Sequence, residues 1–283
     1  MNTRFASGAA ALAGVVLLAI SGASHAGNVG YFGRCSSNSS PVSSITAAGH
    51  TPLAVASMAA ASLVGLDGLL ILSCSFSANA DVNSAVANGL QLIIHDWQPN
   101  GSTPPKLPGT PAVAVATANG GLMDLAAGSP IASGPVAPLT NASLDGGTSS
   151  YHGYATLASL PAGSTPLTII EGNPAAVVTF AYPYGTGRVV YGAMPLDHYL
   201  PGGAYDQANL CGSNPVCTGM RTYLTNLVAW AVPNFISCAD EGFTGSKLTL
   251  CRQVCEIDQT PTRLLSLIKL YKTTYREAPA CAL

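Results

Sequence analysis

The sequence predicts an α/β fold with a mostly parallel sheet flanked by helices. Two continuous apolar runs, 69–72 and 90–94, have the length and composition of strands that are buried on both faces. Between them, residues 79–88 are polar and Ala-rich at helical spacing, and Gly89 ends this segment. The order strand, helix, strand is typical of parallel strands joined by a crossover helix.

Three more expected strands and a closing helix lie before and after a long segment that is rich in Pro and Gly. The first expected strand is the short apolar run at 28–32. Residues 175–180 and 188–193 are expected strands joined by a turn at 184–187, and residues 219–232 are an expected helix that ends at Pro233. Residues 98–166 are crowded with Pro, Gly, Ser, Thr and Ala. This composition predicts a loop-rich insertion or a set of short antiparallel strands.

The composition excludes two classes of protein. Of the 283 residues, 48% are hydrophobic and 8% are charged, and the formal net charge is −2. A disordered chain has low hydrophobicity and high net charge, and a nucleic-acid-binding protein needs a basic surface to displace counterions from phosphates. We therefore expect a globular protein that does not bind nucleic acid.

Residues 1–26 predict a secretory signal peptide. Arg4 precedes an apolar stretch from Ala9 to Ile20, and a run of small residues leads to a cleavage site after Ala26. The apolar stretch is shorter than the roughly 20 residues that cross a bilayer. The mature chain is therefore expected to be secreted, extracellular or periplasmic and to have no membrane span.

Eight cysteines in an exported chain predict four disulfides, because oxidising compartments favour disulfides over thiols and metal sites. We expect one long-range bond, Cys35–Cys74, and one that closes a turn, Cys211–Cys217. The remaining cysteines form two bonds in the tail: Cys238, Cys251, Cys255 and Cys281. Zinc is the weaker interpretation of the tail, because no histidine lies nearby.

Charge divides the mature chain into two parts with a boundary between Pro233 and Asn234. Residues 27–233 contain four basic and eight acidic side chains, whereas the 50 residues of 234–283 contain six and five. Two helical patterns in the tail indicate two short helices. A unit of this size has too small a core to be stable alone, so we expect the disulfides to hold it together.

Five segments of 27–233 occur in an order and at spacings that resemble a known family. They are 48–50, 67–72, 86–95, 184–191 and 226–231. In these segments the chain is similar to the class I glutamine amidotransferase-like fold, and within it to the trehalose-utilisation (ThuA-like) proteins. The resemblance implies an amidotransferase- or flavodoxin-like sheet and a role connected with carbohydrate.

The chain departs from this family at the nucleophile. Glutamine amidotransferases carry a nucleophilic cysteine on a sharp turn after a central strand, but here that strand ends in Ile94, His95 and Asp96. Cys74 follows the preceding strand without flanking glycines, and a thiol in a disulfide cannot attack a substrate. We therefore expect no Cys-His hydrolase.

Histidine and aspartate follow two of the expected strands. In open α/β sheets ligands bind outside the carboxyl ends of the strands, so the candidates for an acid-base or metal site are His95, Asp96, Asp197 and His198. A structural alternative is that each pair only hydrogen-bonds a loop. No cofactor is expected, other than a divalent metal if these four side chains converge.

A Gly-rich loop at 145–154 carries a second candidate site, because His152, Tyr151 and Tyr154 could contact a sugar. The leading hypothesis is a non-catalytic protein that binds a ligand, such as a carbohydrate, or a cell-surface component. One alternative is a carbohydrate-active enzyme that uses the His/Asp set. Another is an extracellular structural or interaction protein.

Overall fold

The protein divides into two compact units, one formed by His25–Phe235 and one that includes Ile236–Leu283. The sequence-based boundary lies between Pro233 and Asn234. The computed structural model describes residues 24–33, 35, 38–74, 76–97, 107–146, 149–212, 214–233, 235–236, 238, 243–255 and 261–276. Residues 1–23, which make up most of the expected signal peptide, and Cys281 lie outside the described residues.

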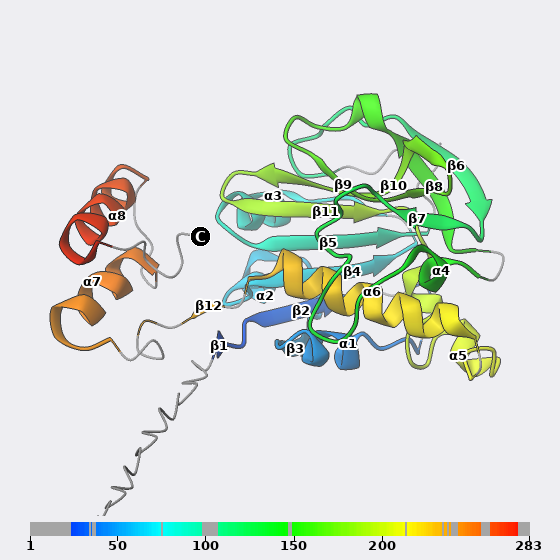
Figure 1. Ribbon diagram of the computed structural model, residues 1–283, viewed down its shortest axis with the longest axis horizontal. Coiled ribbons are helices and arrows are strands. Elements are labelled where there is room, and N and C mark those ends of the chain that lie inside the picture. The colour runs from blue at the N-terminus through cyan, green and yellow to red at the C-terminus, as the bar shows by residue number, and fades with distance from the viewer. Residues whose placement is uncertain are drawn as a thin grey trace, which may run out of the picture. The chain divides into compact units, whose positions relative to one another are not determined.

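The larger unit is built on a ten-stranded sheet with the path β3-β2-β4-β5-β11-β10-β8-β6, on which β9 pairs with β10 and β7 with β9 (Figure 1). Its strands are β2 (Asn28–Phe32), β3 (Thr51–Ala54), β4 (Gly68–Ser73), β5 (Gln91–Asp96), β6 (Val115–Gly120), β7 (Met123–Leu125), β8 (Tyr151–Thr156), β9 (Thr165–Ile170), β10 (Asn173–Tyr184) and β11 (Gly187–Gly192). A two-residue strand, β1 (Ser24–His25), pairs separately with β12 (Phe235–Ile236).

The sheet is mixed rather than mostly parallel. The pairs among β3, β2, β4, β5 and β11 are parallel, whereas the pairs that involve β6 to β10 are antiparallel. The change occurs at β11, because the tight turn after β10 can join only antiparallel neighbours. Residues 98–166, expected to be an insertion, supply β6, β7, β8 and the start of β9 to the same sheet.

Helices cover both faces of the parallel part, which confirms the α/β class. The helices and 3-10 turns of this unit are α1 (Val42–Ala47), α2 (Ala60–Leu63), α3 (Ala80–Ala87), α4 (Asn141–Leu144), η1 (Leu157–Ser159), η2 (Leu196–His198), α5 (Ala204–Gln207) and α6 (Pro215–Ala231). Residues of α1 and α6 pack in one hydrophobic core with Leu70, Leu72 and Ile93. Residues of α2 and α3 pack in the other, with Leu69 and Ile71.

Local sequence explains where the two main helices begin. Asn79 caps α3, since its Oδ1 accepts the amide of Val82 at 2.8 Å. Asn214 caps α6 in the same way, and Pro215 occupies the first position of that helix.

The hairpin turn between β10 and β11 needs glycine. Gly185 has a φ of 63°, and a Cβ at this position would lie 2.3 Å from the carbonyl oxygen of Ala87 at the end of α3. The turn therefore packs directly on α3, and no phosphate-binding helix follows it.

The second unit contains the helices α7 (Gly245–Cys255) and α8 (Pro261–Tyr275), which agree with the two helical patterns of the tail. Its described core consists of Cys238, Cys251 and Tyr271, all fully buried. Among the described residues, no helix combines the length and the hydropathy that crossing a bilayer requires.

Candidate functional site

His95 and Asp96 are adjacent at the carboxyl end of β5 and point to opposite faces of the sheet, because side chains alternate along a strand. The His95 imidazole packs against Tyr223 of α6, with ring centroids 5.6 Å apart. The carboxylate of Asp96 lies on the other face, where its Oδ2 accepts the amide of Phe76 at 3.2 Å. These two candidates therefore do not act on one ligand from the same side.

His95 is a core residue and not an exposed one at the edge of the sheet. Its exposed fraction is 1%, and neither ring nitrogen has a hydrogen-bond partner. Gly192 on β11 makes room for the ring, since a Cβ there would lie 2.5 Å from Nδ1. Burial lowers the pKa of His95 to about 3, so the imidazole is neutral at physiological pH.

Asp197 and His198, in contrast, meet two residues from elsewhere in the chain. Asp197 Oδ1 accepts a short hydrogen bond from the indole Nε1 of Trp97. The rings of Trp97 and His198 are 3.8 Å apart between centroids. His152 Nδ1 lies 3.0 Å from the carbonyl oxygen of Trp97, and the two rings meet edge to face at 5.6 Å. We call Trp97, His152, Asp197 and His198 the indole–imidazole cluster.

Hydrogen bonds from three backbone amides, those of Trp97, His152 and Cys35, position this cluster. The Trp97 amide donates to Ser73 at 3.0 Å, which extends the β4–β5 pairing by one residue. The His152 amide donates to Ala193, just after β11, at 2.8 Å. The loops after β2 and β4 are joined by the Cys35–Cys74 disulfide, and the Cys35 amide donates to Asp197 Oδ2 at 2.8 Å. The cluster therefore lies at the carboxyl ends of the parallel strands.

The cluster combines a buried carboxylate with partly exposed rings. Asp197 has an exposed fraction of 1%, whereas Trp97, His152 and His198 are half-buried. Burial lowers the pKa of His198, Asp197 partly offsets this effect, and His152 lowers the pKa further. His198 Nδ1 is a buried nitrogen atom without a hydrogen-bond partner in the protein.

The two tyrosines of the predicted sugar site do not share the environment of His152. Tyr151 is buried in the core with an exposed fraction of 9%, and it needs Gly120 opposite, where a Cβ would lie 2.3 Å from its hydroxyl. Tyr154 packs partly against the same core. All three candidates lie on β8 rather than in the expected loop, and His152 is the one that contacts Trp97.

Sequence reasoning missed Trp97 and Tyr205 as site residues. Trp97 follows the two strand-end candidates directly, and its position one residue beyond the buried run was the available signal. Tyr205 lies in α5, with its ring 5.7 Å from that of His198 and stacked on Tyr199 at 4.9 Å. No pattern in the sequence indicates that contact.

The cysteines near this site are bonded, as expected. Cys35 pairs with Cys74, and Cys211 pairs with Cys217. Cys74 therefore carries no thiol in this state. Within the described part of the chain, no three of the His and Asp candidates have ligand atoms within 4.8 Å of one another. These side chains therefore do not converge on one metal position.

No protein-family model and no curated protein matches the chain. Solved structures with a similar arrangement include a cytoplasmic protein from Salmonella typhimurium LT2, with 12% identity and a TM-score of 0.47 over 72% of this chain and 99% of the other. A ThuA-like protein from Parabacteroides merdae ATCC 43184 matches with 12% identity and a TM-score of 0.36, over 74% and 90%. A β-galactosidase from Rahnella sp. R3 matches with 10% identity and a TM-score of 0.40, over 74% and 32%.

Proposed function

We propose that this chain is an exported protein whose α/β unit binds a neutral, hydroxyl-rich ligand of the carbohydrate class at the indole–imidazole cluster, without catalysis. The observation that supports binding without catalysis is the hydrogen bonding of the Asp197 carboxylate. Both of its carboxylate oxygens accept hydrogen bonds from protein N–H groups, one from Trp97 and one from Cys35. A carboxylate held in this way orients its neighbours and is poorly placed to exchange protons with a substrate.

The other titratable candidates support binding over acid-base chemistry. His95 is buried and neutral, and Asp96 accepts a backbone amide on the opposite face of the sheet. A glycosidase needs two carboxyl groups that flank the scissile bond. The described cluster contains one carboxylate, and that carboxylate is already hydrogen-bonded.

The remaining groups of the cluster suit a sugar. Trp97 of the cluster and Tyr205, whose ring neighbours that of His198, present aromatic rings that are half-buried, and such rings pack against the apolar faces of sugar rings. A neutral imidazole offers one donor and one acceptor, which matches a hydroxyl group.

Export is the second part of the proposal. Three disulfides join described cysteines, and bonds of this kind persist in oxidising compartments. The signal peptide of residues 1–26 would supply the route. We infer a periplasmic or extracellular location from these two features together.

An enzyme is the second candidate, because one observation favours it. His152 lies close enough to lower the pKa of His198, and the lowered pKa leaves His198 able to accept a proton at neutral pH. Such an enzyme would act on carbohydrate through this imidazole pair, with Asp197 as the residue that orients Trp97.

Calorimetry with a panel of neutral mono- and disaccharides tests the proposal. We expect one sugar to bind, His152→Ala and His198→Ala each to weaken it by at least about tenfold, and Tyr154→Phe on the same strand to leave affinity unchanged. Sugar that is recovered chemically unchanged after prolonged incubation supports binding, whereas turnover that His198→Ala abolishes establishes the enzyme. Equal affinity in all three variants would place the ligand elsewhere.

A further inference from the structure

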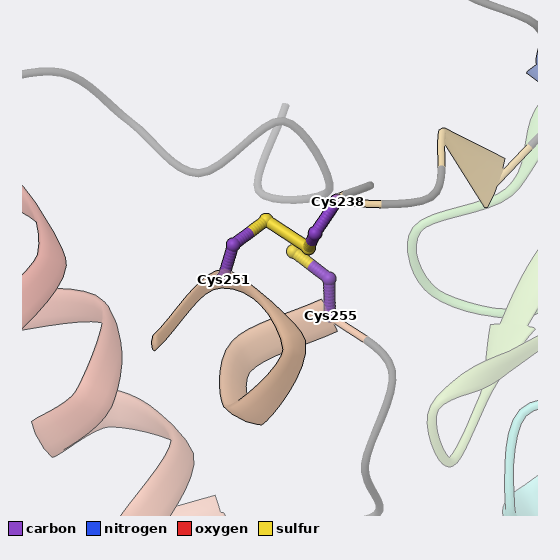
Figure 2. A group of neighbouring side chains, drawn as sticks. All are labelled: Cys238, Cys251 and Cys255. Atoms are coloured by element: carbon purple, nitrogen blue, oxygen red, sulfur yellow. A yellow bond between two sulfur atoms is a disulfide. The ribbon is translucent and has the colours of Figure 1, made fainter. Parts of the chain in front are cut away.

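Three cysteine sulfur atoms lie together in the C-terminal unit. The Sγ atoms of Cys238, Cys251 and Cys255 are all within 4.8 Å of one another (Figure 2). Cys238 and Cys251 form a disulfide, and Cys255 is also disulfide-bonded. The sequence left the pairing of the four tail cysteines open, and the fourth of them, Cys281, lies outside the described residues.

The fold of this unit brings the three sulfurs together independently of the α/β unit. Cys251 and Cys255 are four positions apart on α7, so both side chains leave the same face of the helix, one turn from each other. Cys238 approaches that face from the segment before the helix (Figure 2). Cys238 and Cys251 are fully buried, whereas Cys255 at the end of α7 is half-buried and accessible from solvent.

The three sulfurs lie near enough to one another for a single metal ion to reach all of them once the disulfides are reduced. In a tetrahedral zinc site with Zn–S bonds of about 2.3 Å, two sulfurs are about 3.8 Å apart. After reduction, the Sγ atoms of Cys238 and Cys251, which are 2.02 Å apart in the disulfide, would have to separate to this distance, and rotation of the two side chains can provide it. Cys255 Sγ already lies within 4.8 Å of both. A zinc site with three protein ligands keeps its fourth position for water.

We propose that the reduced C-terminal unit binds one Zn²⁺ through Cys238, Cys251 and Cys255, so that this unit is held together by disulfides when oxidised and by zinc when reduced. The core of the unit is too small to be stable by burial alone, and both kinds of cross-link are used by small domains. Three thiolates and one Zn²⁺ carry a net charge of −1, which Lys247 and Arg252 on the same helix offset.

The chemistry requires an external dithiol as reductant. Each disulfide takes up two electrons and two protons from the dithiol, which becomes a disulfide itself, and yields two thiols. Zn²⁺ then displaces one proton from each of the three thiols, and the protons pass to solvent. An external disulfide, acting as oxidant, reverses both steps: it takes up two electrons and two protons for each bond formed, and the metal is released.

Titration of the full chain with Zn²⁺, and with Co²⁺ as a spectroscopic probe, tests this proposal after reduction by excess dithiol. We expect one equivalent of metal per chain with a Kd below about 1 µM and a thiolate-to-cobalt charge-transfer band. The oxidised chain should bind none at this site. Proteolysis of the reduced chain should spare α7 and α8 when zinc is present and cleave them when a chelator replaces it.

Three variants test whether Cys255 is a metal ligand and whether cysteines of the other unit bind the metal instead. Cys255→Ser should weaken zinc binding at least about 100-fold, and Cys255→His, which restores a ligand at the half-buried position, should recover most of the affinity with an altered cobalt spectrum. The double variant Cys211→Ser with Cys217→Ser removes two thiols of the other unit and should bind zinc as wild type does. The absence of a charge-transfer band in the reduced wild type, or full affinity in Cys255→Ser, would overturn the proposal.

Discussion

Burial of His95 predicts that acid destabilises the α/β unit through this residue. The pKa of His95 is lowered from 6.5 to about 3 in the folded protein, whereas the unfolded chain keeps the ordinary value. Between these two values the unfolded state binds a proton that the folded state does not, so stability is lost as the pH falls below 6.5 and the loss levels off near pH 3. From pH 7 to pH 5 the free energy of unfolding should fall by about 2 kcal/mol from His95 alone.

The assay is urea unfolding at pH 7 and at pH 5, followed by tryptophan fluorescence with the disulfides intact. Both tryptophans, Trp97 and Trp230, belong to the α/β unit, so the signal does not report on the C-terminal unit. The matched variant is His95→Leu, which removes the titrating group and fills the site with an apolar side chain. Because all other titrating groups are shared, the difference between the two proteins isolates His95.

Wild type should lose about 2 kcal/mol more than His95→Leu between the two pH values. At pH 7 the leucine variant should be as stable as wild type or more so, because the buried imidazole nitrogens have no partners. Parallel losses in the two proteins would refute the reasoning, and so would an imidazole signal of His95 that titrates near pH 6.5 in NMR spectra of the folded protein.

Three further predictions concern packing and the disulfides. Gly192→Ala should destabilise the α/β unit by about 1–3 kcal/mol in chemical unfolding, because the new methyl group meets the His95 ring, and in a His95→Ala background the cost should largely disappear. Titration of the unfolded, unreduced chain with a thiol reagent should find no free thiol, whereas one or two equivalents would make Cys74 available as a nucleophile. Reduction in the presence of a chelator should unfold α7 and α8 while the α/β unit largely survives, and limited proteolysis with mass spectrometry would contradict this if α7 and α8 stayed intact.

The sequence by itself determined those elements whose signals are local. The strands β4 and β5 were found because both are apolar on both faces. The helix α3 between them was found because residues 79–88 are Ala-rich at helical spacing and Gly89 ends this segment. Disulfides were predicted from cysteine number and the expected export, and the helices α7 and α8 from their apolar spacing. Each of these features depends on residues that are neighbours in the chain.

The composition of 98–166 pointed to loops or short antiparallel strands, but the sequence did not show that these strands extend the main sheet. Short strands rich in Gly, Ser and Thr have weak local signals. Two of them, β8 and β9, pair with β10, and β10 is available to them only because it already forms a hairpin with β11. The edge strand β3 was missed for the same reason, since it is short and mostly exposed.

The candidate site was decided by tertiary structure. Trp97 and Asp197 are 100 residues apart and Trp97 and His152 are 55 apart, so only the strand order, with β5 beside β11, brings them to one place. His95 and Asp96 were separated by the alternation of side chains along a single strand, and α6 then buried His95 completely. A sequence shows which residues could do chemistry, but whether a side chain meets a ligand depends on the face of the sheet it occupies and on what packs against that face.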